Sequence, residues 1–143
     1  MATFVPVNII ASVFVRRDLA LLINAFGGTL ADLNDTIGDS FSGGLLGDHF
    51  VAGNANDTLN GSLGSDLMRG GGGDDLFSYT SALDAPGDTI DGGAGADELR
   101  TGAGVASYDF TGTTFDGTSG AAIEVLNIFN STTQNVIFNA SQF

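Results

Sequence analysis

Aspartate recurs at intervals of nine residues in the middle of this 143-residue chain. From Gly43 to Ser78 the chain divides without gaps into four nine-residue units, and the sixth place of every unit is aspartate. A degenerate unit at 34–42 and two later units at 83–91 and 92–100 continue the pattern. The sixth-place residues are Asp39, Asp48, Asp57, Asp66, Asp75, Asp88 and Asp97. Small residues occupy the first and second places of the four central units and the fourth place of three of them.

This spacing of carboxylates and small residues predicts sites for a hard cation. A turn rich in glycine can adopt positive φ and bring its backbone carbonyls close to an ion. Calcium prefers a mixed set of carboxylate and carbonyl oxygens. We therefore predict that the seven aspartates, with Gly43, Gly61, Gly70, Gly72 and Gly92 of the same turns, bind several Ca²⁺ ions. The alternative is a metal-free array in which each aspartate caps its turn through Asx hydrogen bonds.

The residues that follow each aspartate must position these turns. The eighth place of each central unit is a large apolar residue, namely Phe50, Leu59, Met68 and Phe77. Because side chains alternate along an extended chain, this residue would point inward. A single unit cannot bury it alone, so the units must stack. The units resemble the G-G-x-G-x-D-x-U-x repeat of RTX proteins. That resemblance implies an all-β fold, a right-handed parallel β-roll with two units in each coil.

In the RTX family each ion lies between turns i and i+2 on the same edge, which implies two rows of aspartates here. One row would contain Asp39, Asp57, Asp75 and Asp97, and the other Asp48, Asp66 and Asp88. Four extra residues at 79–82 and Pro86 at a glycine place interrupt the second row, and we expect them to weaken the site shared by its last two members. Ala106 occupies the next aspartate place, so the repeats are predicted to span 34–109.

The flanking segments are predicted to cover the two ends of the roll. Residues 1–33 combine an apolar strand region at 2–15 with a short helix at 19–26, which Asp18 would cap and Gly27 would end. This strand-and-helix segment resembles the caps of β-helical proteins. Residues 110–143 contain short apolar runs and few acids, which predicts metal-free β-coils without a helical or polar cap at their end.

Composition limits the partners and the chemistry of the chain. The net charge is −13, and the four basic residues are all arginine, which disfavours nucleic acid and anionic membrane surfaces as partners. Cysteine is absent. The apolar stretch 5–15 is too short to cross a bilayer, so no membrane insertion is expected. The single histidine, His49, falls at an outward place, and we predict that the chain is not an enzyme. Arg69, Asp91 and Arg100 are predicted to be solvated outward charges.

These observations lead to a functional prediction with two alternatives. The chain is expected to be a calcium-binding RTX β-roll module that folds on binding calcium and has a structural or binding role. The family resemblance implies an extracellular or cell-surface location, reached by bacterial type I secretion. The first alternative is a self-assembling surface-layer or filament subunit that associates through the ends of the solenoid. The second is the accessory domain of a secreted enzyme.

Overall fold

A computed structural model describes residues 7–10, 28–31, 37–103, 107–118, 122–128 and 135–142. The strands are β1 (Val7–Ile10), β2 (Gly28–Ala31), β3 (Ser40–Ser42), β4 (His49–Gly53), β5 (Thr58–Asn60), β6 (Leu67–Gly72), β7 (Leu76–Tyr79), β8 (Thr89–Ala94), β9 (Glu98–Thr101), β10 (Ser107–Asp109), β11 (Thr114–Phe115), β12 (Val125–Ile128) and β13 (Asn135–Ile137). The one helical element among these residues is a 3₁₀ turn, η1 (Ala140–Gln142). The fold is therefore all-β, as predicted.

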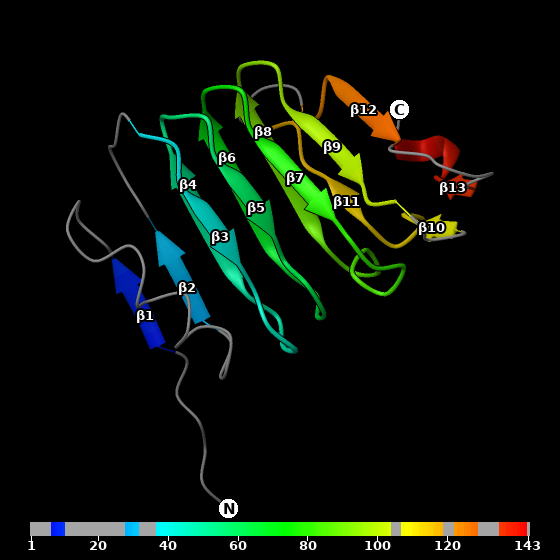
Figure 1. Cartoon of the computed structure of the whole chain (residues 1–143), viewed down its shortest axis with the longest axis horizontal. Coiled ribbons are helices and arrows are strands. Elements are labelled where there is room, and N and C mark those ends of the chain that lie inside the picture. Colours follow the sequence, from blue (N-terminus) through cyan, green and yellow to red (C-terminus); the bar gives the residue numbers. More distant parts are fainter. Residues whose placement is uncertain are drawn as a thin grey trace, which may run out of the picture.

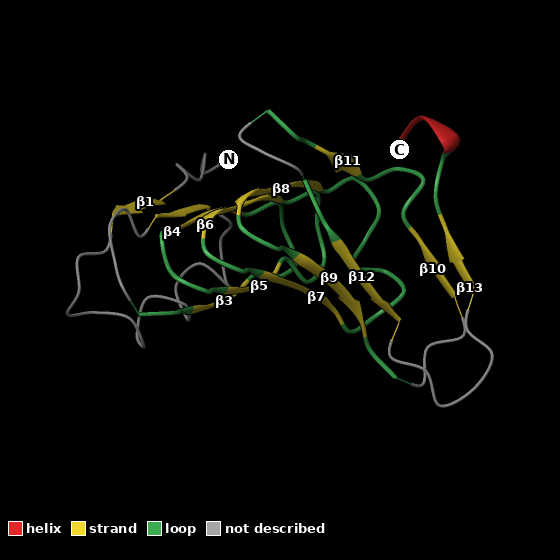
Figure 2. Cartoon of the chain, turned by 90° about the horizontal axis from the view of Figure 1, so that it is seen from above, coloured by secondary structure: helices red, strands yellow, loops and turns green. Residues whose placement is uncertain are grey.

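Successive strands alternate between two parallel sheets. One sheet has the order β1-β2-β4-β6-β8-β11 and the other the order β12-β9-β7-β5-β3. Figure 1 shows the strands side by side along the long axis, and Figure 2 shows the two sheets as separate layers. Phe50 pairs with Met68 and Leu59 pairs with Phe77, so a strand lies beside the strand two units further along the chain. The molecule is a parallel β-solenoid with two nine-residue units in each coil, which confirms the predicted fold class.

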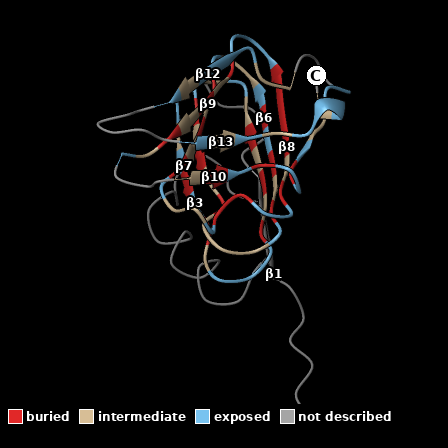
Figure 3. Cartoon of the chain, turned by 90° about the vertical axis from the view of Figure 1, so that its right-hand side faces the viewer, coloured by how far each residue is buried: buried red, intermediate tan, exposed pale blue. Residues whose placement is uncertain are grey.

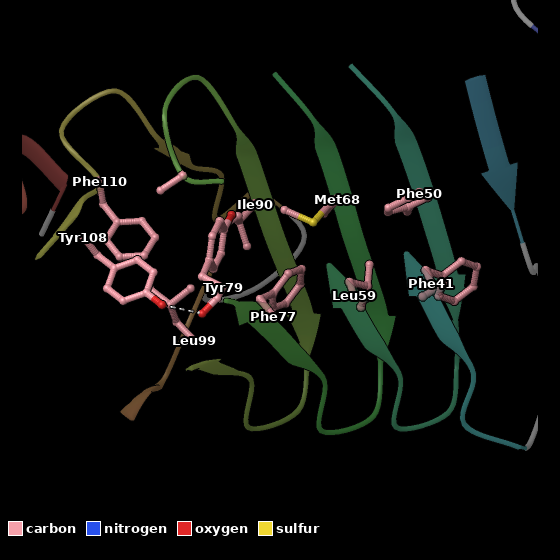
Figure 4. Packing of buried hydrophobic residues seen from close by; sticks show 12 residues of the cluster. Phe41, Phe50, Leu59, Met68, Phe77, Tyr79, Ile90, Leu99, Tyr108 and Phe110 are labelled. Atoms are coloured by element: carbon pink, nitrogen blue, oxygen red, sulfur yellow. Dashed lines mark hydrogen bonds between the residues drawn. The ribbon is translucent and has the colours of Figure 1, made fainter. Parts of the chain in front are cut away.

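The core lies between the two sheets and is built from the eighth-place side chains. Strands β4 and β5 alternate between buried and partly exposed residues, as the period of two requires. The buried side chains include Phe41, Phe50, Leu59, Met68, Phe77, Ile90 and Leu99, each at most 4% exposed. Figure 4 shows them as a continuous row, and Figure 3 shows the buried residues on the facing strands of both sheets. No unit buries its apolar residue alone, so the coils stabilise one another.

At the N-terminal side, the first sheet extends beyond the repeats. Strand β2 pairs in parallel with β4, and β1 pairs in parallel with β2. The predicted strand region at 2–15 thus contains β1. The predicted helix at 19–26 lies outside the described residues.

The C-terminal part of the chain adds strands to both sheets of the solenoid and also forms a separate pair of strands. Strand β11 pairs with β8 and β12 pairs with β9, whereas β10 and β13 form a separate two-stranded parallel sheet. Among the described residues, this segment also contains the 3₁₀ turn η1, which the sequence analysis did not predict. The side chain of Gln142, in η1, donates hydrogen bonds to the backbone oxygens of Phe110 (2.7 Å) and Thr113. Sequence reasoning missed this turn because it is only three residues long and its hydrogen bonds reach residues about thirty positions away.

Candidate metal centres

The sixth-place aspartates form two columns, one on each edge of the solenoid. We call Asp39, Asp57, Asp75 and Asp97 the four-aspartate column, and Asp48, Asp66 and Asp88 the three-aspartate column. Within each column, the Oδ1 atom of an aspartate accepts a hydrogen bond from the backbone N–H of the aspartate one coil earlier. The N···O distances run from 2.6 Å between Asp39 and Asp57 to 2.9 Å between Asp75 and Asp97. The structure thus places all seven aspartates in the two rows that the resemblance implied.

Asp66, Asp75 and Asp97 each have a buried Oδ2 atom that accepts no hydrogen bond from the described residues. All three residues are at most 2% exposed. Burying an ionised carboxylate costs a large free energy unless the charge is paired or coordinates a metal. Each of these oxygens therefore needs a cation or a proton.

The same burial controls the protonation of the columns. The pKa of Asp66 rises from 3.8 to about 7, chiefly because burial disfavours the charged form, with like charges at Asp48 and Asp88 adding to the shift. The pKa of Asp75 also rises to about 7, again first through burial and then through the charges of Asp57 and Asp97. Hydrogen bonds from backbone N–H groups act in the opposite direction. Without a cation, the columns hold carboxylates that resist ionisation near neutral pH.

Glycine at the first place of a unit makes room for the carboxylate of the same turn. A Cβ atom at Gly61, Gly70 or Gly92 would lie only 2.1 to 2.3 Å from the Oδ2 atom of the aspartate five residues later. At Gly43 the corresponding distance to Asp48 Oδ2 is 2.6 Å. Gly72 differs, because a Cβ there would meet nothing nearer than 3.6 Å. Four of the five predicted site glycines are thus required by the carboxylate, and Gly72 is not.

The available donors suit calcium. The turns offer carboxylate and backbone carbonyl oxygens, which are the ligands of hard cations, and contain no cysteine. Within the described ranges, no point gathers three or more acidic, histidine or cysteine side chains. A site in these turns must therefore combine one or two carboxylates with backbone carbonyls, which is the mixed donor set that calcium accepts. The residues present fit the ion that the sequence predicted.

Sequence reasoning missed a carboxylate that extends the four-aspartate column. Glu124 Oε2 accepts a hydrogen bond of 2.7 Å from the backbone N–H of Asp97, the same contact that aspartates make elsewhere in the column. Glu124 directly precedes β12, which pairs with β9, just as Asp97 directly precedes β9. The sequence feature that could have identified Glu124 is an acid followed by the apolar Val125 and Leu126, as at the start of a strand. Glu124 was missed because it lies 27 residues after Asp97, a spacing that differs from the rest of the column.

Asp88 and Asp91 also depart from expectation. The hydroxyl of Tyr79 donates a hydrogen bond of 2.8 Å to Asp88 Oδ2, the oxygen that has no donor in Asp66. Burial raises the pKa of Asp88 to about 6, while hydrogen bonds from Asp66 and Tyr79 oppose that rise. Asp91 was predicted to be solvated but is 2% exposed, with Arg69 Nε 3.8 Å from its Oδ2. The prediction was wrong for Asp91, whose carboxylate lies beside the guanidinium of Arg69, its partner in the register of β6 and β8.

The parallel coils and the columns of buried carboxylates define a β-roll whose turns are suited to cations. Residues 42–77 and 87–105 match the RTX calcium-binding nonapeptide repeat in four copies. This part of the chain therefore belongs to the RTX calcium-binding repeats, as the sequence resemblance predicted. Comparison with curated proteins and with solved structures gave no match. Among the described residues, no helix has the length and apolarity needed to span a membrane.

Proposed function

We propose that the chain is an extracellular module that folds when its aspartate columns bind calcium, and that it serves a structural or binding role. The observation that carries this proposal is the set of buried Oδ2 atoms of Asp66, Asp75 and Asp97, which accept no hydrogen bond within the described residues. Bound calcium would supply positive charge to these oxygens. The candidate ligands are Asp39, Asp48, Asp57, Asp66, Asp75, Asp88 and Asp97, with backbone oxygens from the turns that contain Gly43, Gly61, Gly70, Gly72 and Gly92.

The charge of the columns links binding to folding. Without calcium the buried carboxylates repel one another and lack counter-charge, which disfavours the stacked state. Because the ligands of each site come from different coils, the unfolded chain holds no preformed site, and the free energy of binding becomes free energy of folding. Extracellular calcium modules bind with dissociation constants of about 10⁻⁴–10⁻³ M. Such affinities would keep the repeats unfolded in a calcium-poor cytosol, a state suited to type I secretion, and fold them outside.

A calcium titration followed by far-ultraviolet circular dichroism tests this proposal. We expect a cooperative gain of β signal with calcium and none with magnesium at the same concentration. Asp75→Asn should shift the midpoint to higher calcium, since it removes a buried charge. Asp109→Asn removes the same charge from an exposed residue and should leave the midpoint unchanged. A full β signal in chelator that calcium does not alter would refute calcium-dependent folding.

Self-association through the end of the solenoid is a second candidate. Among the described strands, β12 is the last of its sheet, and Val125, Leu126 and Ile128 are each between 41% and 44% exposed. Leu126 pairs with the buried Leu99 and so holds an eighth place, which points toward the core. A second copy of the chain that stacked on β12 would cover this side chain. Sedimentation velocity in calcium measures this association, and Leu126→Ser should reduce it; a monomer at high protein concentration would exclude it.

A further inference from the structure

The turn between β7 and β8 is built differently from its counterparts on the same edge. The turns before β4 and β6 span six residues each, 43–48 and 61–66, whereas this turn spans residues 80–88. We call residues 80–88 the inserted turn. It carries Pro86 in place of a glycine and ends with Asp88, the last member of the three-aspartate column. Its greater length allows contacts that a six-residue turn does not make.

Tyr79 occupies the place that glycine holds in the regular turns. It follows the ninth-place residue Ser78, just as Gly61 follows Asn60. In the regular turn the missing Cβ leaves room for an Oδ2 atom that has no hydrogen-bond donor, as at Asp66. In the inserted turn the same place carries a phenol, whose hydroxyl donates to Asp88 Oδ2 at 2.8 Å. Tyr79 is 1% exposed, so this hydrogen bond is shielded from water.

Other oxygens of the inserted turn are also bound by protein donors. The hydroxyl of Thr113 donates a buried hydrogen bond of 2.6 Å to the backbone oxygen of Ala85. Asp84 Oδ2 accepts the backbone N–H of Ser81 at 2.8 Å. The hydroxyl of Tyr108 donates to the backbone oxygen of Tyr79, the residue directly before the turn, at 3.0 Å, a contact drawn in Figure 4. Carboxylate oxygens of Asp84 and Asp88 and the carbonyl oxygen of Ala85 are therefore engaged in this turn.

We propose that Tyr79 replaces a calcium ion at Asp88, so that the inserted turn is closed by hydrogen bonds and takes no metal. This inference rests on the proposed function, since it concerns which of the predicted ligands hold an ion. A hydroxyl donor satisfies the buried oxygen that a cation satisfies elsewhere, and a buried hydrogen bond to a charged acceptor is among the stronger ones. The last carboxylate of the three-aspartate column is therefore bound by a tyrosine hydroxyl instead of an ion. Its turn forms at any calcium concentration at which the coils are stacked.

Native mass spectrometry in calcium-containing ammonium acetate counts the ions held by each variant. Asp88→Asn keeps Oδ1 for the N–H of Asp66 and presents an amide to the Tyr79 oxygen, and we expect it to bind as many ions as the original chain. Asp75→Asn, the matched control, should bind at least one fewer. Loss of an ion in Asp88→Asn would overturn the inference while leaving the proposed function in place.

A second variant keeps the inference testable if Asp88→Asn does not fold. Tyr79→Phe removes only the hydroxyl and so releases Asp88 Oδ2. We expect it to bind at least as many ions as the original chain, and a smaller number would overturn the inference. An original chain that bound no calcium would instead refute the proposed function, so the two failures are distinct.

Discussion

Two glycines in one turn offer a sharp test of the carboxylate columns. A Cβ atom at Gly70 would lie 2.1 Å from Asp75 Oδ2 and 2.7 Å from the backbone oxygen of Gly92, distances that real Cβ atoms do not reach. A Cβ atom at Gly72 would meet Asn54 at 3.6 Å, an ordinary contact. Neither glycine has a positive φ, so alanine suits the backbone at both places. The substitutions Gly70→Ala and Gly72→Ala therefore differ in whether the carboxylate of Asp75 and the neighbouring backbone at Gly92 must move.

The size of this difference follows from the hydrogen bond that the movement breaks. Asp75 Oδ1 accepts the N–H of Asp57 at 2.8 Å, and a hydrogen bond to a charged group contributes about 1.5–3 kcal/mol. Alanine in place of glycine at a compatible position stabilises a protein by about 0.4–1 kcal/mol, through the unfolded state. Both variants gain this unfolded-state term, so it cancels, and Gly70→Ala should have a free energy of unfolding lower than that of Gly72→Ala by about 1.5–3 kcal/mol. This difference corresponds to a change in the folding equilibrium of roughly 10-fold to 150-fold.

Urea unfolding in saturating calcium, followed by circular dichroism, measures the difference. The calcium titration midpoint of Gly70→Ala should also lie above that of Gly72→Ala, because the displaced carboxylate is a predicted ligand. The reasoning is refuted if both variants unfold at the same urea concentration. It is also refuted if Gly72→Ala is the less stable of the two.

Three further predictions address the core, the charges and the end of the column. Phe77→Ala should lower the free energy of unfolding by about 3–5 kcal/mol in urea titrations, because the side chain is fully buried. Leu83→Ala, at a residue 68% exposed, is the control and should change it by less than about 0.5 kcal/mol. The pKa values of Asp66 and Asp75 are raised from 3.8, the value expected for the unfolded chain, to about 7 in the fold. Stabilisation of the metal-free fold by protonation is therefore fully present below the unfolded pKa and is lost as pH rises through about 7. Acidification from pH 8 to 5 should therefore increase the β signal in chelator, and should weaken calcium binding when calcium is present. Glu124→Ala should raise the calcium midpoint seen by circular dichroism, because it removes the last carboxylate of its column, whereas Glu124→Gln, which keeps an acceptor, should raise it less.

The regular part of the molecule could be predicted from the sequence because the same nine-residue unit, one turn and one strand, repeats along it. The apolar residue two places after each aspartate predicts the core, and the resemblance to RTX repeats, with two units in each coil, implies which aspartates share an edge. Asp57 and Asp75 were placed in one row because they are two units apart, and the hydrogen bond between them follows that spacing. The places of Gly61 and Gly70 follow from the same repeat, since the carboxylate of each turn requires them.

The departures could not be predicted because they depend on contacts between segments out of phase. Glu124 lies three units from Asp97 rather than two, and only the pairing of β12 with β9 brings them together. Asp91 has the spacing of an outward residue, but it is buried and its carboxylate lies beside Arg69. The role of Tyr79 required knowing that this residue, counted among the extra residues at 79–82, continues the register of the preceding unit and has its side chain in the core. For Glu124 and Tyr79, a loop of different length changes which residue meets the repeat.

The two edges of the solenoid consequently depend on cations to different extents. In the four-aspartate column, Asp75 and Asp97 each have a buried oxygen without a donor, and the column continues to a further carboxylate, Glu124. In the three-aspartate column, Asp66 has such an oxygen, but Asp88 is bound by the hydroxyl of Tyr79. Because both edges belong to the same coils, the edge with the more uncompensated charge limits the stability of each coil. Calcium should therefore control folding mainly through the four-aspartate column, while the inserted turn and the aromatic residues beside it hold one side of the last coils together without an ion.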